Sequence, residues 1–335
     1  DQLWAVYHSA FLNKSKQIIN IRAINKSILS VLRKISIRKR LLIAFMSISI
    51  FPIIVVGIYS IKNYEKSLQS KISLYSMQVL TEISKNVNNV LSKYESLTEE
   101  IIIDEDVQDG LKNYDTMNDV EKFEYLDKLS TQKLNRRIYG FNNLKNIHIR
   151  LLDGRMLYDL GYEIYKNSEV ERILKRTEES KNNLYFTYTR SLSGSDCIVI
   201  SRWINLIENP DQKLGHLMIV VDEKVFAKQI YKNVDMGEGS KIFICDNDGV
   251  VVSSVSDEFE KGKSCNVNGF FDKLKKNYEE NNFVYISNDR DSKNLVAVAG
   301  ISPAKWYLVA QIPFSYIYSE SVDVRNGVVL VSIIV

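Results

Sequence analysis

Residues 41–61 read LLIAFMSISIFPIIVVGIYSI, a run of 21 residues without a charged side chain. At about 1.5 Å per residue, a helix of this length rises roughly 31 Å, which is enough to cross the apolar core of a bilayer. Pro52 removes one backbone donor, which membrane helices tolerate. Core helices of soluble proteins seldom run uncharged for so long. The stretch therefore predicts a transmembrane helix that places the two ends of the chain on opposite sides of a membrane.

Charge is unevenly distributed about this run. The 335 residues carry 44 Lys and Arg and 41 Asp and Glu, for a net charge of +3. Residues 1–40 hold nine of the basic residues and one acidic residue, so the rest of the chain has a net charge of −5. Basic residues mark the cytoplasmic end of a membrane helix, and no small-x-small cleavage site follows residue 61. We therefore expect an uncleaved anchor, with residues 62–326 extracytoplasmic at a cell membrane. This charge balance does not indicate nucleic-acid binding.

Beyond the membrane, the apolar residues from Lys62 to Ile103 recur every three or four positions without an intervening Gly or Pro. Such a helix is about 63 Å long, which is more than a compact domain needs. We expect a stalk whose apolar seam packs on a partner helix, on its own domain, or on both. A second helix with the same spacing is predicted from about Val120 to Tyr139.

From residue 146 the apolar period changes to two, which predicts β-strands. Alternating residues lead to Asp153-Gly154, a hairpin turn, and a helix and three strands follow. The same order of events recurs about 95 residues later, with Asp248-Gly249 as the second turn. Two consecutive copies of one unit explain this better than one irregular sheet.

These patterns divide the chain into six parts. Residues 327–335 are apolar but too few to span a bilayer, so we expect them to begin a second membrane helix that is cut short. The predicted parts are a basic cytoplasmic tail (1–40), transmembrane helix 1 (41–61), a stalk helix and second helix (62–139), a membrane-distal module (145–235), a membrane-proximal module (236–315), and an exit helix with the truncated start of transmembrane helix 2 (316–335).

This organisation resembles the double Cache sensor region of bacterial transmembrane receptors. Four segments more specifically resemble YesM-type sensor histidine kinases, namely SIRKRLL (36–42), SKISLYSMQVLTEISKNVNNVL (70–91), IIIDEDVQDGL (101–111) and WYLVAQIPFSYIYSES (306–321). The resemblance implies an α+β fold. In this fold, a long N-terminal helix forms the membrane anchor and the stalk, and two tandem PAS-like antiparallel β-sheet modules follow it.

The resemblance also implies a function. It is the extracytoplasmic signal-sensing region of a two-component sensor histidine kinase, whose kinase part is not in this chain. The implied partners are a small-molecule ligand or an extracytoplasmic binding protein, a second copy in a homodimer, and a response regulator reached through the kinase. No cofactor is expected. The alternatives are the ectodomain of a chemoreceptor or a diguanylate cyclase and, in another class, a membrane-tethered adhesion or assembly protein.

Aromatic and basic residues on the predicted strands of the membrane-distal module are the candidate ligand site. A pocket for a small anion or polyol needs a few convergent donors in an aromatic lining, and Arg can hold a carboxylate through two hydrogen bonds. The alternative is that each side chain lies on a solvent-exposed face. Amino-acid-binding double Cache domains share an Arg-x-Trp element, which the adjacent Arg202-Trp203 does not match. The candidates are Tyr158, Tyr188, Arg190, Arg202 and Trp203.

Other polar motifs have structural explanations. Asp222 could bind the amine of a ligand, and it is also placed to cap the helix that follows it. Residues 246–249 read DNDG, the start of a calcium loop, but the Glu expected nine residues after Asp248 is absent, which favours a hairpin turn. The three cysteines cannot all pair within one chain and lack zinc-ligand spacing. Cys245 and Cys265 are either an extracytoplasmic disulfide or buried free thiols. No catalytic arrangement and no metal site is predicted.

Overall fold

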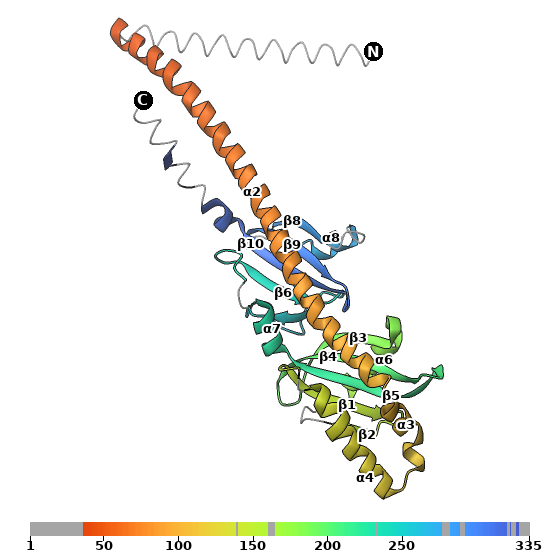
Figure 1. Ribbon diagram of the computed structural model, residues 1–335. Helices are drawn as coiled ribbons and strands as arrows, with labels where there is room; N and C mark the ends of the chain where they lie inside the picture. The colour runs from red at the N-terminus through yellow and green to blue at the C-terminus, as the bar shows by residue number, and fades with distance from the viewer. Residues whose placement is uncertain are drawn as a thin grey trace, which may run out of the picture. The chain divides into compact units, whose positions relative to one another are not determined.

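The computed structural model in Figure 1 describes residues 36–138, 140–159, 165–231, 234–276, 282–288, 292–319, 322 and 326–327. The predicted basic tail up to residue 35 and most of the predicted second membrane helix lie outside the described residues. The chain divides into two compact units. One comprises residues 68–319, and the other comprises residues 1–67 and 320–335.

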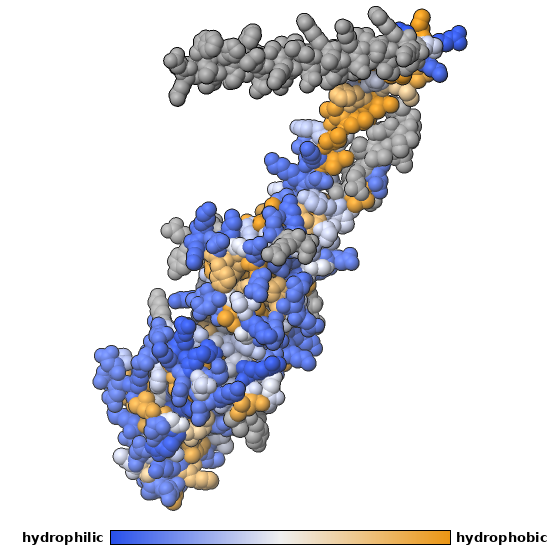
Figure 2. Space-filling view, turned by 180° about the vertical axis from the view of Figure 1, so that it is seen from behind, coloured by the Kyte–Doolittle hydropathy of each residue, from blue (hydrophilic) through white to orange (hydrophobic). Residues whose placement is uncertain are grey.

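A single helix, α2 (Ile37–Ile102), contains both the predicted anchor and the predicted stalk. Its 66 residues include Pro52 without an interruption of the helix. Its N-terminal part is long and apolar enough to cross a membrane, and large apolar side chains such as Phe45, Ile48 and Phe51 are exposed there. Figure 2 shows hydrophobic residues gathered on that part of α2, whereas the face of the sheet modules seen in this view is mostly hydrophilic.

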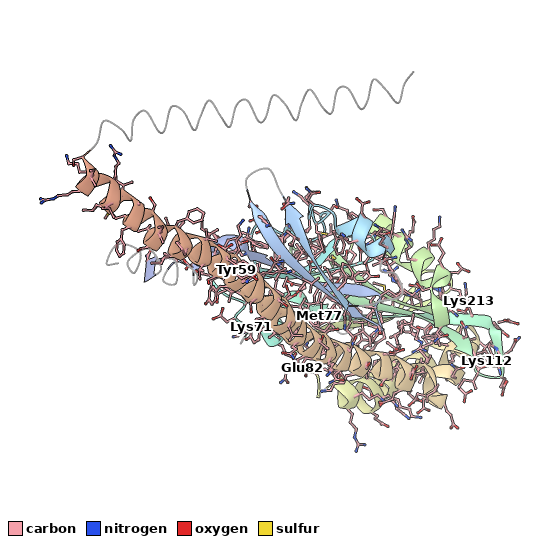
Figure 3. The ribbon with its side chains drawn as sticks, turned by 90° about the horizontal axis from the view of Figure 1, so that it is seen from above. Tyr59, Lys71, Met77, Glu82, Lys112 and Lys213 are labelled. Carbon is pink, nitrogen blue, oxygen red and sulfur yellow. The ribbon has the colours of Figure 1, made fainter. Side chains whose placement is uncertain are left out.

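The C-terminal half of α2 is part of the core. Leu80, Val87, Leu91 and Ile101 follow a helical spacing and are completely buried. They share one apolar cluster with residues of both sheets, so the helix packs on its own domain. In Figure 3, Met77 and Glu82 mark this half of α2.

Short helices follow α2. They are α3 (Glu105–Asn113), η1 (Tyr114–Thr116), α4 (Asp119–Lys128), the π-helix η2 (Leu129–Leu134) and α5 (Asn135–Ile138). Asn118 and Glu121 form a capping box at the start of α4. The second helix predicted from Val120 therefore exists, but a π-helical turn lies inside it. Val120 and Phe123 at its start are exposed, whereas Leu134 is buried.

The first module is an antiparallel sheet in the order β2-β1-β5-β4-β3. Its strands are β1 (Leu144–Leu151), β2 (Met156–Asp159), β3 (Leu184–Arg190), β4 (Asp196–Leu206) and β5 (Asn209–Asp222). Side chains alternate between the two faces. Ile147 and Ile200 belong to the cluster that contains α2, whereas Val199 and Val220 pack with the other helix, α6 (Asn167–Glu179).

The second module repeats this design. Its sheet has the order β7-β6-β10-β9-β8, so each strand takes the place that the strand numbered five lower has in the first sheet. Its strands are β6 (Lys241–Cys245), β7 (Val251–Ser254), β8 (Asn282–Asn288), β9 (Lys293–Ile301) and β10 (Trp306–Pro313), with α8 (Phe270–Lys276) between β7 and β8. Helix α7 (Glu223–Tyr231) connects the two modules. The predicted fold class is confirmed.

Candidate ligand-binding site

A cleft of about 800 Å³ lies between the two modules, within the unit formed by residues 68–319. Strands β3 and β4 and helix α7 form one side, and the segment 254–261 after β7 forms the other. We call it the inter-module cleft. Two of the predicted site residues, Tyr188 and Arg190, line it.

Tyr188 and Arg190 are held at the cleft by a tight hairpin. Arg190 is directly opposite Asp196 in the β3–β4 register, and Gly194 in the connecting turn has a φ of +88°, which favours glycine. The Tyr188 hydroxyl donates to Asp196 Oδ1 at 2.7 Å. Arg190 Nε lies 3.4 Å from the same oxygen and also donates to the carbonyl of Gly194. Asp196 thus fixes both predicted residues.

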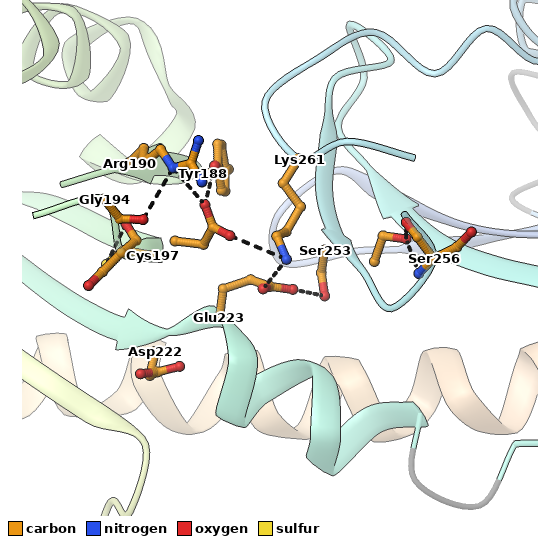
Figure 4. Close-up of polar contacts among 12 residues, drawn as sticks. Tyr188, Arg190, Gly194, Cys197, Asp222, Glu223, Ser253, Ser256 and Lys261 are labelled. Atoms are coloured by element: carbon orange, nitrogen blue, oxygen red, sulfur yellow. Dashed lines mark hydrogen bonds and ion pairs between the residues drawn. The ribbon is translucent and has the colours of Figure 1, made fainter. Parts of the chain in front are cut away.

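Lys261 connects this cluster to the second module (Figure 4). Its ammonium nitrogen lies 3.3 Å from Asp196 Oδ2 and 3.0 Å from Glu223 Oε2. The other carboxylate oxygen of Glu223 accepts a hydrogen bond of 2.7 Å from Ser253. Burial opposes the charge on Lys261, but the hydrogen bond to Glu223 and the charges of Glu223 and Asp196 outweigh it and raise the pKa of Lys261. Lys261 is therefore charged at neutral pH.

The cleft offers both signs of charge. Five basic and five acidic side chains line it, with apolar surface from residues such as Ala227, Tyr231 and Phe259 between them. The two signs therefore balance along the lining of the cleft. The charged lining residues are Lys145, Arg190, Lys224, Lys228 and Lys261, with Asp196, Asp222, Glu223, Asp257 and Glu260.

Arg202 and Tyr158 lie elsewhere in the first module, on the sheet face that belongs to the α2 cluster. Arg202 is 9% exposed, donates to Thr98 Oγ1 at 3.0 Å and lies 3.2 Å from Glu99 Oε1 on α2. Tyr158, on β2, is buried, and this burial raises its pKa. The structure does not bring these two residues to the inter-module cleft.

Trp203 faces the opposite side of the same sheet because it follows Arg202 directly in a strand. Its ring meets the His216 ring edge-on at 5.0 Å, and the Lys213 ammonium lies 4.3 Å from it. His216 Nε2 is 2.8 Å from the Ser201 hydroxyl, which in turn contacts Thr177 of α6. Burial lowers the pKa of His216 to about 3. Trp203 Nε1 and His216 Nδ1 have no hydrogen-bond partner among the described residues.

Several residues of these sites had no signal in the sequence. Asp196 is the exception, because the hairpin register places it opposite Arg190. Glu223 and Lys261 come from different elements, and nothing in their spacing relates them. The Ser201–His216 pair lies on neighbouring strands and would have required the β4–β5 register. Within the described part of the chain, no group of three His, Cys, Asp or Glu side chains could hold a metal ion.

Two tandem antiparallel sheets built on one long helix define a tandem-module sensor domain. The chain belongs to the Cache domain family, whose double Cache model matches residues 64–321. The predicted resemblance to double Cache sensors is thereby confirmed, and the chain is a Cache ligand-binding sensor domain. The YesM-type resemblance stays a prediction.

Solved structures share the fold at low sequence identity. The extracellular domain of rpHK1S-Z16, assigned as a histidine kinase, has a TM-score of 0.54 at 14% identity, covering 71% of this chain and 92% of its own. The ligand-binding domain of Mlp24 with asparagine has a TM-score of 0.53 at 16% identity, and the match covers 76% of this chain and 99% of that domain. The ligand-binding domain of the Pseudomonas fluorescens chemoreceptor CtaA with L-isoleucine has a TM-score of 0.50 at 14% identity, and the match covers 77% of this chain and 98% of that domain. No curated protein sequence matches the chain.

Proposed function

We propose that this chain is the extracytoplasmic signal-sensing region of a membrane-bound two-component sensor histidine kinase, and that its ligand binds in the inter-module cleft. The observation that carries the proposal is the convergence of Tyr188 and Arg190 from the first module with Lys261 from the second on Asp196. A ligand at this point contacts both modules at once. The four YesM-like segments and the apolar part of α2 support the assignment to a membrane-bound kinase.

The ligand class that fits the cleft is a small molecule with one carboxylate and one ammonium group. Arg190 is held through Nε by Asp196 and the carbonyl of Gly194, but its side chain is 62% exposed, so its terminal guanidinium nitrogens can take a carboxylate. The carboxylate of Asp257 on the cleft wall offers a contact for an ammonium group, whereas that of Asp222 already pairs with Lys145 at 3.3 Å. The asparagine and L-isoleucine held by the Mlp24 and CtaA domains are molecules of this class.

Signalling follows from a population shift. The Lys261 bridge to Asp196 and Glu223 favours one arrangement of the modules in the absence of ligand. A ligand that binds Arg190 competes for the Asp196 contacts and favours another arrangement of the modules. The ligand can shift the equilibrium only by as much as its affinities for the two arrangements differ. Helix α2, which packs on both sheets, then carries the change toward the membrane, where we expect a second copy in a homodimer.

A thermal-shift screen tests ligand binding. The full chain in lipid nanodiscs is melted with single amino acids, small carboxylates, sugars and short peptides. A ligand at a hundred times its Kd stabilises a single site by about 2.7 kcal/mol, which is measurable. Arg190→Ala should remove the shift, whereas the control Lys112→Ala, which lies outside the cleft, should keep it. A shift that persists in Arg190→Ala would place the ligand elsewhere.

The output requires a separate test, because a chemoreceptor ectodomain is the second candidate on the strength of the CtaA fold. Membranes that contain the full-length gene product are incubated with labelled ATP. A kinase should become phosphorylated on histidine, in an acid-labile form, to an extent that depends on the ligand. Absence of phosphorylation, together with ligand binding by the ectodomain, would favour the chemoreceptor.

A further inference from the structure

Strand β3 is the last strand of the first sheet, and only one of its edges has a strand beside it. Strand β4 pairs with that edge, and among the described residues no strand pairs with the other. The Ser191 amide donates to the carbonyl of Ser195 at 2.9 Å, and in an antiparallel pair such bonded residues alternate with residues whose backbone groups face away. Thr189 is therefore bonded to β4, whereas the backbone N–H and C=O groups of Tyr188 and Arg190 face the open edge.

A groove of about 550 Å³ follows this open edge, and we call it the edge groove. Tyr185 and the four consecutive residues 187–190 line it. Because neighbouring side chains of a strand point to opposite faces, a groove that touches consecutive residues lies along the edge and not on one face. Helix α6 forms one wall of the edge groove, and the turn between β6 and β7 forms the other. The edge groove therefore contacts both modules.

The two ends of the edge groove differ in charge. Glu169, in the first turn of α6, accepts a hydrogen bond of 3.4 Å from the strand residue before Arg190. Lys166, which directly precedes α6, is exposed and forms no ion pair with a residue that the structure describes, so this end has an unneutralised positive charge. Seven residues further along α6, Arg176 lies 3.8 Å from Asp248, whose side chain is 63% exposed. An accessible carboxylate thus lies at the other end.

The separation of these charges suits a short extended chain. Seven residues of an α-helix rise about 10.5 Å, which is the length of about three residues in a strand. Glu169 is itself paired with Arg172 at 2.9 Å, so it does not cancel the charge of Lys166. A single amino acid spans only one of the two ends.

We infer that the ligand is a short peptide that binds in extended form and adds a strand to the open edge of β3. The inference rests on the proposed function for the contact between the ligand carboxylate and Arg190, which lines both the inter-module cleft and the edge groove. With its carboxylate at Arg190, the peptide runs parallel to β3, and its ammonium group lies beside Asp248. Main-chain hydrogen bonds to Tyr188 and Arg190 supply affinity for a peptide of about three to four residues.

Calorimetric titration of the full chain in lipid nanodiscs tests the dependence on length. The probes are alanine, trialanine and tetra-alanine, because main-chain bonding does not need particular side chains. Tetra-alanine should bind at least about tenfold more tightly than alanine. Equal affinities of alanine and tetra-alanine would overturn the inference, and so would a failure of both peptides to bind.

Single N-methylation of the probe tests strand pairing. Only alternate N–H groups of an extended peptide face β3, so methylation of either the second or the third residue of tetra-alanine should weaken binding by at least about tenfold, and methylation of the other should not. Equal effects of the two methyl groups would contradict the addition of a strand.

Hydrogen exchange, resolved to single amides, locates the peptide. Saturating tetra-alanine should slow the exchange of the Tyr188 and Arg190 amides by at least about tenfold, because these amides gain hydrogen bonds. The amides of Thr187 and Thr189 are the internal control, since they already bond to β4 and should change little. Unchanged exchange at Tyr188 and Arg190 with bound peptide would overturn the inference.

A substitution at the far end of the edge groove tests the ammonium contact. Asp248→Asn should weaken tetra-alanine about two- to fivefold and should leave N-acetylated tetra-alanine unaffected, because acetylation removes the ammonium charge. Asp272→Asn is the matched control, since Asp272 lies on α8 and lines neither the inter-module cleft nor the edge groove. Equal losses for the two forms of the peptide would exclude Asp248 as the partner of the ammonium group.

Arg190→Ala separates this inference from the proposed function. If alanine and tetra-alanine bind equally well and Arg190→Ala weakens both, the proposed function stands and the peptide inference fails. If tetra-alanine protects the β3 amides but Arg190→Ala leaves its affinity unchanged, the strand pairing stands and the carboxylate contact of the proposed function fails. The inference expects both amide protection and a loss of affinity of at least about tenfold in Arg190→Ala.

Discussion

The ammonium nitrogen of Lys261 lies 3.0 Å from the carboxylate of Glu223, although Lys261 belongs to the second module and Glu223 follows the last strand of the first. The Glu223 side chain is 1% exposed and that of Lys261 25%. Such a pair is worth little as a net source of stability, but the loss of one partner leaves the other charge buried and unpaired. Lys261 therefore neutralises a charge that the fold buries between the two modules.

Lys261→Met should destabilise the domain strongly. Breaking a buried pair costs about 3–5 kcal/mol, and the partial exposure of Lys261 favours the lower end of that range. Thermal unfolding of the full chain, followed by tryptophan fluorescence, measures the loss. Lys261→Met combined with Glu223→Gln should recover part of it, because no charge is then left unpaired.

Lys263→Met is the matched control for this lysine. Lys263 lies two residues away and pairs with Glu260, but its side chain is 68% exposed. Exposed pairs contribute at most about 1 kcal/mol, so this variant should melt close to the parent protein. Equal effects of the two substitutions would show that the bridge to Glu223 has no special role.

The two candidate arginines should separate into two phenotypes. Arg202 is buried against α2 and bound to Thr98 and Glu99, so Arg202→Ala should cost about 1–3 kcal/mol of stability by leaving those groups without their partner. Arg190 is largely exposed, so Arg190→Ala should cost less than about 1 kcal/mol and should instead weaken ligand binding. Melting and ligand titration of both variants measure the two effects. A ligand affinity reduced equally in both would contradict this division.

Much of the fold was predictable because helices, strands and turns leave local patterns of apolar and turn-forming residues in the sequence. The uncharged run before residue 62 and the apolar seam through Ile83, Val87 and Ile101 indicate a long helix. The repeated turns at Asp153 and Asp248 indicate the duplicated module. The π-helical turn inside the second helix had no such signal, since its residues are ordinary helix formers.

The candidate site was less predictable, for a physical reason. Adjacent strand residues point to opposite faces, so Arg202 and Trp203 could not line one pocket, and the alternation alone separates them. The pairing of Arg190 with Asp196 follows from a hairpin register that a short turn fixes. The meeting of Glu223 with Lys261 depends on how one sheet packs against the next, which no local pattern encodes.

His216 should make stability depend on pH between about 4 and 6.5. The folded state binds a proton on this buried ring only near pH 3, whereas an unfolded histidine binds one below about 6.5. Between these values the unfolded state binds more protons, so stability falls as the pH falls, by up to about 1.4 kcal/mol per pH unit from this group. Above pH 6.5 this contribution is complete.

His216→Asn should remove this part of the pH slope. The free energy of unfolding, measured by denaturant titration at several pH values, gives the slope for both proteins. Burial opposes the charge on Asp104, but Arg137 and Lys133 outweigh it and lower the pKa of this carboxyl group. The stability that Asp104 contributes is therefore lost only when the pH falls below the ordinary pKa of an aspartate. Burial raises the pKa of Asp246, which gives an opposite slope common to both proteins. Identical slopes in the two proteins would mean that His216 is protonated in the folded state.

Gly237 joins α7 to β6 and should not tolerate a side chain. Its φ is +98°, and a Cβ there would clash with the ring of Tyr316, in the helical turn that follows β10. Gly237→Ala would therefore combine the strain of a positive φ, about 1–3 kcal/mol, with an overpacking cost of about 1–3 kcal/mol. Gly154→Ala is the control, since its φ is +87° but no atom lies within 4 Å of its Cβ position. Melting of both variants should show the larger loss for Gly237→Ala, and the added substitution Tyr316→Ala should reduce the excess; equal losses would mean that backbone strain alone fixes this glycine.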